Sequence, residues 1–322
     1  MNQKNNIFIV GAGTFGTALA ERLSWNRNNR ITLYTIEDDV YRELLQEHKN
    51  STYFPGRQVS SDIIPVCSFD GIGDSDVILL TVPSNAIEEV SREIYPLIPS
   101  HTLVVNLAKG FSHEGRLLPE VLPFSRMASL KGPTFAVEIM NGMPSAMTVG
   151  GSAEDFELLS QRVFKHTAIT LDHTEDARGV ELLSILKNAY AISVGIVSGR
   201  YNSPNVDFQV ITKALNEMRE FLRRYRCSGD TVFCYCGIGD LGLTSLNDLS
   251  RNRTLGLLIG KGFYSDMEHR LVIEGMKTVK VIGERLRKKD ELDRFPLLKG
   301  LYTLMYEHND VHTFCSEVLS LD

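Results

Sequence analysis

The feature that most constrains the fold is a change of pattern near the middle of the chain. Up to about residue 150, short apolar runs alternate with stretches of helix length. Near-continuous apolar strands that alternate with helices indicate a parallel sheet covered on both faces. We therefore predict a doubly wound α/β domain in this half. The expected strands are 7–10, 31–34, 76–82, 102–107 and 145–150, and the expected helices include 14–24, 38–47 and 85–95.

Beyond residue 180 the sequence is almost wholly helical in pattern. A polar and charged stretch, 172–179, comes before this part and is predicted to be a linker. We therefore place an N-terminal domain at 1–176 and an all-helical C-terminal domain at 177–322. The helical segments expected in the second domain are 180–197, 210–225, 256–263, 272–289 and 295–307.

A glycine-rich turn follows the first predicted strand. Gly11, Gly13 and Gly16 fit the pattern GxGxxG between a strand and a helix. The first glycine permits a tight turn, the second lets the backbone approach a pyrophosphate, and the third lets helix and strand pack closely. The N–H groups at the helix start would then face a negative charge. The turn predicts a Rossmann-like, dinucleotide-binding domain at 1–176; an ordinary strand–helix turn is the alternative.

The end of the second predicted strand indicates which dinucleotide is bound. Glu37, Asp38 and Asp39 follow it, and no arginine comes before Arg42. An acidic residue here binds a ribose hydroxyl, whereas an arginine accepts a 2′-phosphate. The sequence therefore favours NAD over NADP. The alternative is that Asp38 or Asp39 only caps the following helix.

Composition excludes several other classes of protein. The 322 residues carry a formal net charge of −6 without a Lys/Arg-rich run, which argues against nucleic-acid or membrane-surface binding. The polar start, MNQKNN, and the lack of a long uncharged apolar run predict a cytoplasmic protein without a membrane span. Five cysteines, among them Cys234 and Cys236, are expected to be reduced and in the core, and no metal site is expected.

Two lysines stand where chemistry needs a cation. Lys187 lies in an otherwise apolar helical stretch, so burial would lower the pKa of its ammonium group and suit it to protonate an oxygen. A lysine that reaches out from a helix edge is the alternative. Asp240, between glycines, could pair with Lys187, or could be a solvated turn residue. Lys109, at the C-terminal end of a predicted strand, could polarise a carbonyl, or could be a surface lysine.

A basic segment at 250–253, Ser-Arg-Asn-Arg, could hold a phosphate. Arg251 can bind a phosphate bidentately and Asn252 adds a neutral donor. Arg253 is two residues further along the same expected helix and is predicted to face solvent.

Taken together and in order, these segments resemble the NAD(P)-dependent glycerol-3-phosphate dehydrogenases. The shared motifs are GAGTFGTALA, AKG, GPTFA, LKN, GIGDL, SRNR and VIEG, and the resemblance covers nearly the whole chain. It implies a homodimeric enzyme that supplies a phospholipid precursor. It implies the catalytic residues Lys187, Lys109 and Asp240 and the substrate-binding residues Asn188, Thr244, Arg251 and Asn252. The implied NAD-binding residues are Gly11, Gly13, Thr14, Phe15, Gly16, Pro83, Lys109, Ala136, Arg251 and Glu274.

The chain also departs from the usual family pattern. Small residues usually precede Leu-Lys-Asn, and a glycine-rich loop usually follows; here these places hold bulkier residues at 183–185 and at 199–205. The position before Gly132 is usually serine and is Lys131 here. These changes leave two alternatives open. One is a paralogue that reduces another small phosphorylated or acidic ketone, and the other is a non-catalytic, NADH-binding regulator.

Overall fold

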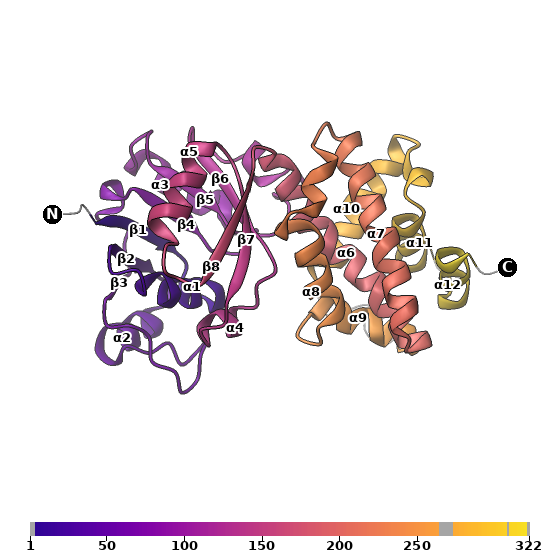
Figure 1. The fold of residues 1–322 in the computed structure, drawn as a ribbon, viewed down its shortest axis with the longest axis horizontal. Helices are drawn as coiled ribbons and strands as arrows, with labels where there is room; N and C mark the ends of the chain where they lie inside the picture. The colour runs from indigo at the N-terminus through magenta and orange to yellow at the C-terminus, as the bar shows by residue number, and fades with distance from the viewer. Residues whose placement is uncertain (1–3, 264–272, 308, 321–322) are drawn as a thin grey trace. The chain divides into compact units, whose positions relative to one another are not determined.

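The computed structural model describes residues 4–263, 273–307 and 309–320 (Figure 1). Internal contacts divide the chain into two compact units, Met1–Glu181 and Leu182–Asp322. The division falls inside helix α6 (Ala177–Tyr201), whose first residues belong to the first unit.

The first unit is built on one eight-stranded sheet of the order β3-β2-β1-β4-β5-β6-β7-β8. The neighbours from β3 to β6 pair in parallel, β7 runs antiparallel to β6, and β8 is parallel to β7. This is the predicted Rossmann-like architecture with a reversed pair of strands at one edge. The strands are β1 (Asn5–Val10), β2 (Asn29–Tyr34), β3 (Ile63–Val66), β4 (Val77–Leu80), β5 (Leu103–Asn106), β6 (Met127–Lys131), β7 (Ser145–Gly150) and β8 (Ile169–Thr174).

Alternate residues of the strands pack into two separate cores, because successive side chains point to opposite faces of a sheet. In β1, Ile7 and Ile9 belong to the core that includes residues of α1, whereas Phe8 and Val10 belong to the core that includes residues of α3. Both faces are therefore covered, as the apolar runs predict. The helices of this unit before α6 are α1 (Thr14–Ser24), α2 (Asp38–Glu47), α3 (Ile87–Ile94), α4 (Ala136–Met140) and α5 (Ala153–Glu157).

Two expectations for the first unit need correction. Strands β3, β6 and β8 were not among the predicted strands, and all three lie in short segments with little alternation. The predicted linker at 172–179 is wrong: residues 172–174 complete β8 and residues 177–179 begin α6. Polar residues such as Asp172 and His173 fit here because β8 is an edge strand with half-buried positions.

The second unit is helical, and no strand occurs among its described residues. Close backbone packing joins two of its helices: a Cβ atom added to Gly256 of α9 would lie 2.2 Å from the carbonyl oxygen of Ile192 in α6. Gly195 likewise faces the carbonyl oxygen of Arg253 at 2.4 Å from its added Cβ. The helices after α6 are α7 (Pro204–Arg224), α8 (Asp240–Leu246), α9 (Arg251–Gly260), α10 (Glu274–Lys288), α11 (Pro296–Tyr306) and α12 (Val311–Leu319).

Helix α6 is long and apolar enough to cross a membrane by length and composition, but its apolar window is completely buried inside the protein. A core helix of this kind passes the same test. The five cysteines are free thiols, of which Cys236 and Cys315 are buried and Cys67 is exposed. The expectation that the cysteines are core residues is therefore confirmed for Cys236 and Cys315 and wrong for Cys67, and Cys227 and Cys234 are only half-buried.

Candidate functional site

The glycine-rich turn has the geometry of a phosphate cradle. Gly11 has a φ of +114°, which favours glycine, and a Cβ atom on Gly16 would lie 1.9 Å from the carbonyl oxygen of Gly11. A Cβ atom on Gly13 would meet nothing within 4 Å, so the backbone is open on that side. No side chain caps the first turn of α1, which begins at Thr14. The backbone N–H groups at this helix start therefore fit a pyrophosphate.

The other predicted cofactor residues of the first unit surround loops that follow strands. Thr14 and Pro83 are exposed, and Phe15 and Ala136 are half-buried. Pro83 follows β4, and Ala136 is the first residue of α4. Parallel strands place such loops at the carboxyl edge of the sheet, where open α/β sheets bind their ligands.

The acidic segment after β2 is held in place by a tyrosine. The hydroxyl of Tyr53 donates a hydrogen bond to Oε1 of Glu37 at 2.7 Å. Glu37 is the N-cap residue of α2 without a side-chain cap bond, and Asp38 and Asp39 lie in the first helical turn. Neither aspartate occupies the capping position, so the alternative that one of them caps α2 is wrong.

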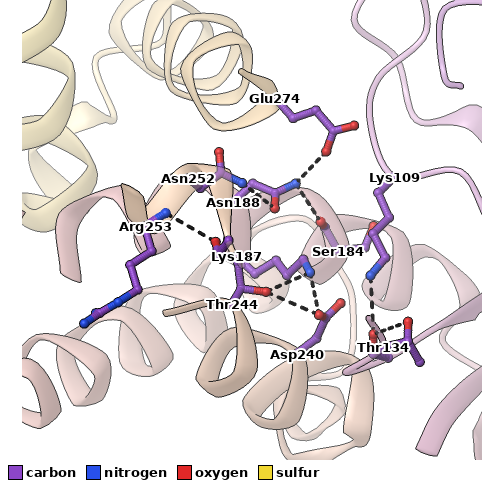
Figure 2. Close-up of polar contacts among 12 residues, drawn as sticks. Lys109, Thr134, Ser184, Lys187, Asn188, Asp240, Thr244, Asn252, Arg253 and Glu274 are labelled. Carbon is purple, nitrogen blue, oxygen red and sulfur yellow. Dashed lines mark hydrogen bonds and ion pairs between the residues drawn. The ribbon is translucent and has the colours of Figure 1, made fainter. Parts of the chain in front are cut away.

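Lys109 lies in the loop after β5, and its side chain is half-buried. Its Nζ atom donates to the carbonyl oxygen of Gly132 at 3.3 Å (Figure 2). Gly132 follows β6, so the lysine joins the ends of two neighbouring strands.

In the second unit, Lys187 and Asp240 form a buried ion pair (Figure 2). Their side chains are only 7% and 2% exposed. Nζ of Lys187 also donates to Oγ1 of Thr244 at 3.0 Å. Asp240 begins helix α8 after a π-helical turn, so it is a helical residue and not the solvated loop residue that the alternative described. A buried ammonium with an anionic partner keeps its position, and it can exchange a proton with a group placed beside it.

Two asparagines lie beside this pair along α6 and α9. Nδ2 of Asn252 donates to Oδ1 of Asn188 at 3.0 Å, and Oδ1 of Asn252 accepts from the N–H of Gly275 at 3.0 Å. Nδ2 of Asn188 donates to Glu274, the exposed first residue of α10, at 3.3 Å. The glycine contacts between α6 and α9 bring the two asparagines within reach of each other. Val272 of the VIEG motif lies outside the described residues.

Arg251 and Arg253 differ in their surroundings. Arg251 is exposed at the first position of α9, where, among the described residues, its side chain makes no hydrogen bond or ion pair. Arg253 is not solvent-facing as predicted: its side chain is 13% exposed and donates to the carbonyl oxygen of Ser245 at 2.6 Å and to Oγ of Ser198 at 3.2 Å. In Figure 2 the Arg253 side chain points away from the Lys187 cluster. Arg253 therefore ties α9 to α6 and to the end of α8.

The sequence interpretation missed a second buried ion pair, in the first unit. Lys131 and Glu181 are both 0% exposed, with Nζ and Oε1 at 3.0 Å. Lys131 was noted only as a departure from serine. The available signal was a lysine at the end of an apolar strand together with a glutamate at the start of an apolar helix. Among the described residues, no group of three or more His, Cys, Asp or Glu side chains is placed to hold a metal ion.

Known proteins resemble the chain over almost its whole length. A family model described as the NAD-dependent glycerol-3-phosphate dehydrogenase N-terminus matches residues 6–157, and one for the C-terminus matches residues 176–316. A glycerol-3-phosphate dehydrogenase [NAD(P)+] of Methanothermobacter thermautotrophicus is 32% identical over 97% of this chain and 96% of its own. One of Syntrophotalea carbinolica is 33% identical over 95% and 94%. The crystal structure of glycerol-3-phosphate dehydrogenase from Coxiella burnetii has a TM-score of 0.85 at 29% identity, covering 98% and 99%.

Proposed function

Because the chain belongs to the NAD-dependent glycerol-3-phosphate dehydrogenase family, we propose that it interconverts glycerol 3-phosphate and dihydroxyacetone phosphate with NAD(H). The observation that carries the proposal is the buried Lys187–Asp240 pair beside the linked side chains of Asn188 and Asn252. Such a pair is costly to desolvate, and here it is accompanied by the polar side chains of Thr244, Asn188 and Asn252, a combination that suits the binding of a small polar substrate. We assign residues 1–176 to cofactor binding and 177–322 to substrate binding.

Lys187 would carry the proton in this reaction. NADH, when bound, supplies the hydride that reduces the C2 carbonyl carbon. The carbonyl oxygen gains negative charge as this happens, and Nζ of Lys187 delivers a proton to it, which gives the alcohol. In the reverse direction the neutral amine takes that proton back. Asp240 and Thr244 fix the position of Nζ through their contacts with it, so the proton is given at one place.

Lys109 would serve as a second cation that polarises the substrate carbonyl or stabilises an oxyanion. Its Nζ–H group is held by the Gly132 carbonyl, which leaves a half-buried positive charge at the end of β5. A fixed charge stabilises a developing oxyanion without having to reorganise. This role explains why Lys109 is half-buried, whereas a surface lysine without a role would be exposed.

The phosphate would be held by the residues at the start of α9. Arg251 is exposed there, and a guanidinium offers paired N–H donors that match phosphate oxygens. Asn188 and Asn252 are oriented by each other and by Gly275, so their remaining polar atoms present a fixed arrangement to the substrate. Glu274, hydrogen-bonded to Asn188, would approach the cofactor.

We further propose that NAD is preferred to NADP. The Tyr53 hydroxyl keeps the Glu37 carboxylate after β2, where it can bind a ribose hydroxyl and repels a 2′-phosphate. We expect kcat/KM for NADPH to be at least about tenfold below that for NADH. Glu37→Ser should reduce the ratio of kcat/KM for NADH to kcat/KM for NADPH. Glu89→Ser, which removes an exposed carboxylate of α3, is the control and should leave this ratio unchanged. Equal kcat/KM values for the two cofactors in the unaltered protein would contradict the preference.

The first test mixes purified protein with NADH and dihydroxyacetone phosphate and follows the nicotinamide absorbance. We expect oxidation of NADH with one equivalent of glycerol 3-phosphate formed. A panel of other small phosphorylated and acidic ketones is measured in parallel. Turnover on another ketone alone would point to a diverged substrate, and NADH binding without turnover on any ketone would point to a regulator. Either result would refute the proposed function.

We also propose that the enzyme is a cytoplasmic homodimer that supplies glycerol 3-phosphate for phospholipid synthesis. The family resemblance and the free thiols support this proposal. Light scattering of the purified protein tests the dimer: the mass of a single 36.1 kDa chain at micromolar concentration would contradict it.

A further inference from the structure

The buried lysine of the first unit contacts the loop that carries Lys109. Nζ of Lys131 donates to the carbonyl oxygens of Asn106 at 2.9 Å and Ala108 at 2.7 Å, and it lies 3.0 Å from Oε1 of Glu181. An ammonium group has three N–H donors, so it can bind three such acceptors at once. Two of the three belong to the backbone immediately before Lys109.

Asn106 and Glu181 complete the network. Nδ2 of Asn106 donates to Oε1 of Glu181 at 2.8 Å, and Oδ1 of Asn106 accepts from the N–H of Ala108 at 3.0 Å. The hydroxyl of Ser129 also donates to Oε1 of Glu181. All of these side chains are buried, so water does not compete for their hydrogen bonds.

The loop is therefore held from several sides. The N–H of Leu107 donates to the carbonyl oxygen of Leu80 at 3.1 Å, and Lys109 donates back to Gly132, the residue after Lys131. Gly110 has a φ of +153°, and a Cβ atom there would lie 2.7 Å from Oγ of Ser84. Lys131, at the end of β6, binds carbonyls of the loop after β5. Lys109, in that loop, binds the carbonyl of Gly132 after β6, so the two lysines link the ends of β5 and β6 in both directions.

We propose that Lys131, charged and paired with Glu181, is a positioning residue that fixes residues 106–108 and thereby aims Lys109 at the reacting carbonyl. This proposal rests on the proposed function, because it needs Lys109 to act on the substrate. Lys131 itself is fully buried and does not touch the substrate. A serine at this position, with its short side chain, could not span the distance to both loop carbonyls, so this chain holds the loop by a device of its own.

The test compares kcat in two backgrounds. Lys131→Met alone leaves the Glu181 carboxylate buried without its cation and could prevent folding. The main variant is therefore the double substitution Lys131→Met with Glu181→Gln, which removes both charges and keeps side chains of similar size. We expect kcat with dihydroxyacetone phosphate to fall about ten- to a hundredfold with KM nearly unchanged, as for other residues that orient a functional group.

In a Lys109→Met background the same double substitution should change kcat less than about twofold, because the group that it positions is already gone. Leu159→Ala is the matched control: Leu159 is fully buried in the same unit, so its loss lowers stability, and we expect kcat to stay unchanged. An equal fall of kcat with and without Lys109, or no fall at all, would overturn the proposal.

Amide hydrogen exchange measures the loop without relying on activity. In the double variant, amides of residues 107–111 should exchange at least about tenfold faster, while those of Leu103–Val105 in β5 keep their protection. Unchanged exchange at 107–111 would overturn the proposal. If the unaltered protein turned over no ketone, the proposed function would fail, and the exchange measurement would still decide whether Lys131 holds the loop.

Discussion

Among the residues that the structure describes, each compact unit holds a buried lysine–carboxylate pair, and the two pairs are built differently. Lys131 and Glu181 are completely buried, and Lys131 is bound by two backbone carbonyls. Lys187 and Asp240 keep a small exposed fraction, and Lys187 contacts the side-chain oxygens of Asp240 and Thr244. A cation tied to backbone carbonyls fixes the path of the chain. A cation held by side chains does not constrain the backbone in this way, and we propose that Lys187 meets the substrate.

The largest effect is expected when the Lys187–Asp240 pair is broken. Lys187→Met should lower kcat/KM for dihydroxyacetone phosphate about a thousandfold or more, which corresponds to roughly 4 kcal/mol of transition-state stabilisation. NADH affinity, measured by fluorescence titration, should change little. Lys280→Met, which alters an exposed lysine of α10, is the control and should match the unaltered protein. A loss of kcat/KM below about tenfold would show that Lys187 is not the proton donor.

The next largest effect is expected on stability, when the Lys131–Glu181 pair is broken. Lys131→Met should lower the free energy of unfolding by about 3 kcal/mol, because the Glu181 carboxylate would stay buried without its cation. Adding Glu181→Gln to Lys131→Met should avoid most of that loss. Urea unfolding of the three proteins measures both values. A single and a double variant of equal stability would show that the charge on Glu181 is not the cause.

A third buried carboxylate sharpens the comparison, since its direct hydrogen-bond partners are neutral. Glu217 accepts from the Tyr190 hydroxyl and from the N–H groups of Leu297 and Leu298 at the start of α11. Burial raises its pKa from 4.5 to about 7, against the opposing effect of these hydrogen bonds. The contribution of this raised pKa to stability is therefore fully present below pH 4.5 and is lost as the pH rises through about 7.

The measurement is the free energy of unfolding at pH 5 and pH 8. The unaltered protein should lose roughly 2 kcal/mol across this window through Glu217, and Glu217→Gln should lose less. Glu220→Gln, in the same helix α7, is the control and should keep the pH dependence of the unaltered protein. If Glu217→Gln kept the pH dependence of the unaltered protein, groups other than Glu217 would cause that dependence.

Much of the fold and of the candidate site could be predicted from local patterns in the sequence. The glycine turn, strands β1, β2, β4, β5 and β7 and the buried helix around Lys187 follow from residue spacing, because alternation and helical period are visible within a few residues. The motifs in their order were enough to identify the family. The pairing of Lys187 with Asp240, 53 residues apart, was one of two alternatives that the sequence left open, because an apolar helix shows that its lysine needs an anion but not which one.

Only the tertiary structure decided the rest. Strands β3, β6 and β8 are strands because neighbouring strands supply their hydrogen bonds, which no local pattern records. Lys131 and Glu181 contact residues 23 to 75 positions away, and the Asn188–Asn252 bond spans 64. Such contacts depend on how the elements pack. A sequence shows which side chains need a partner when they are buried, and the fold determines which partner each one meets.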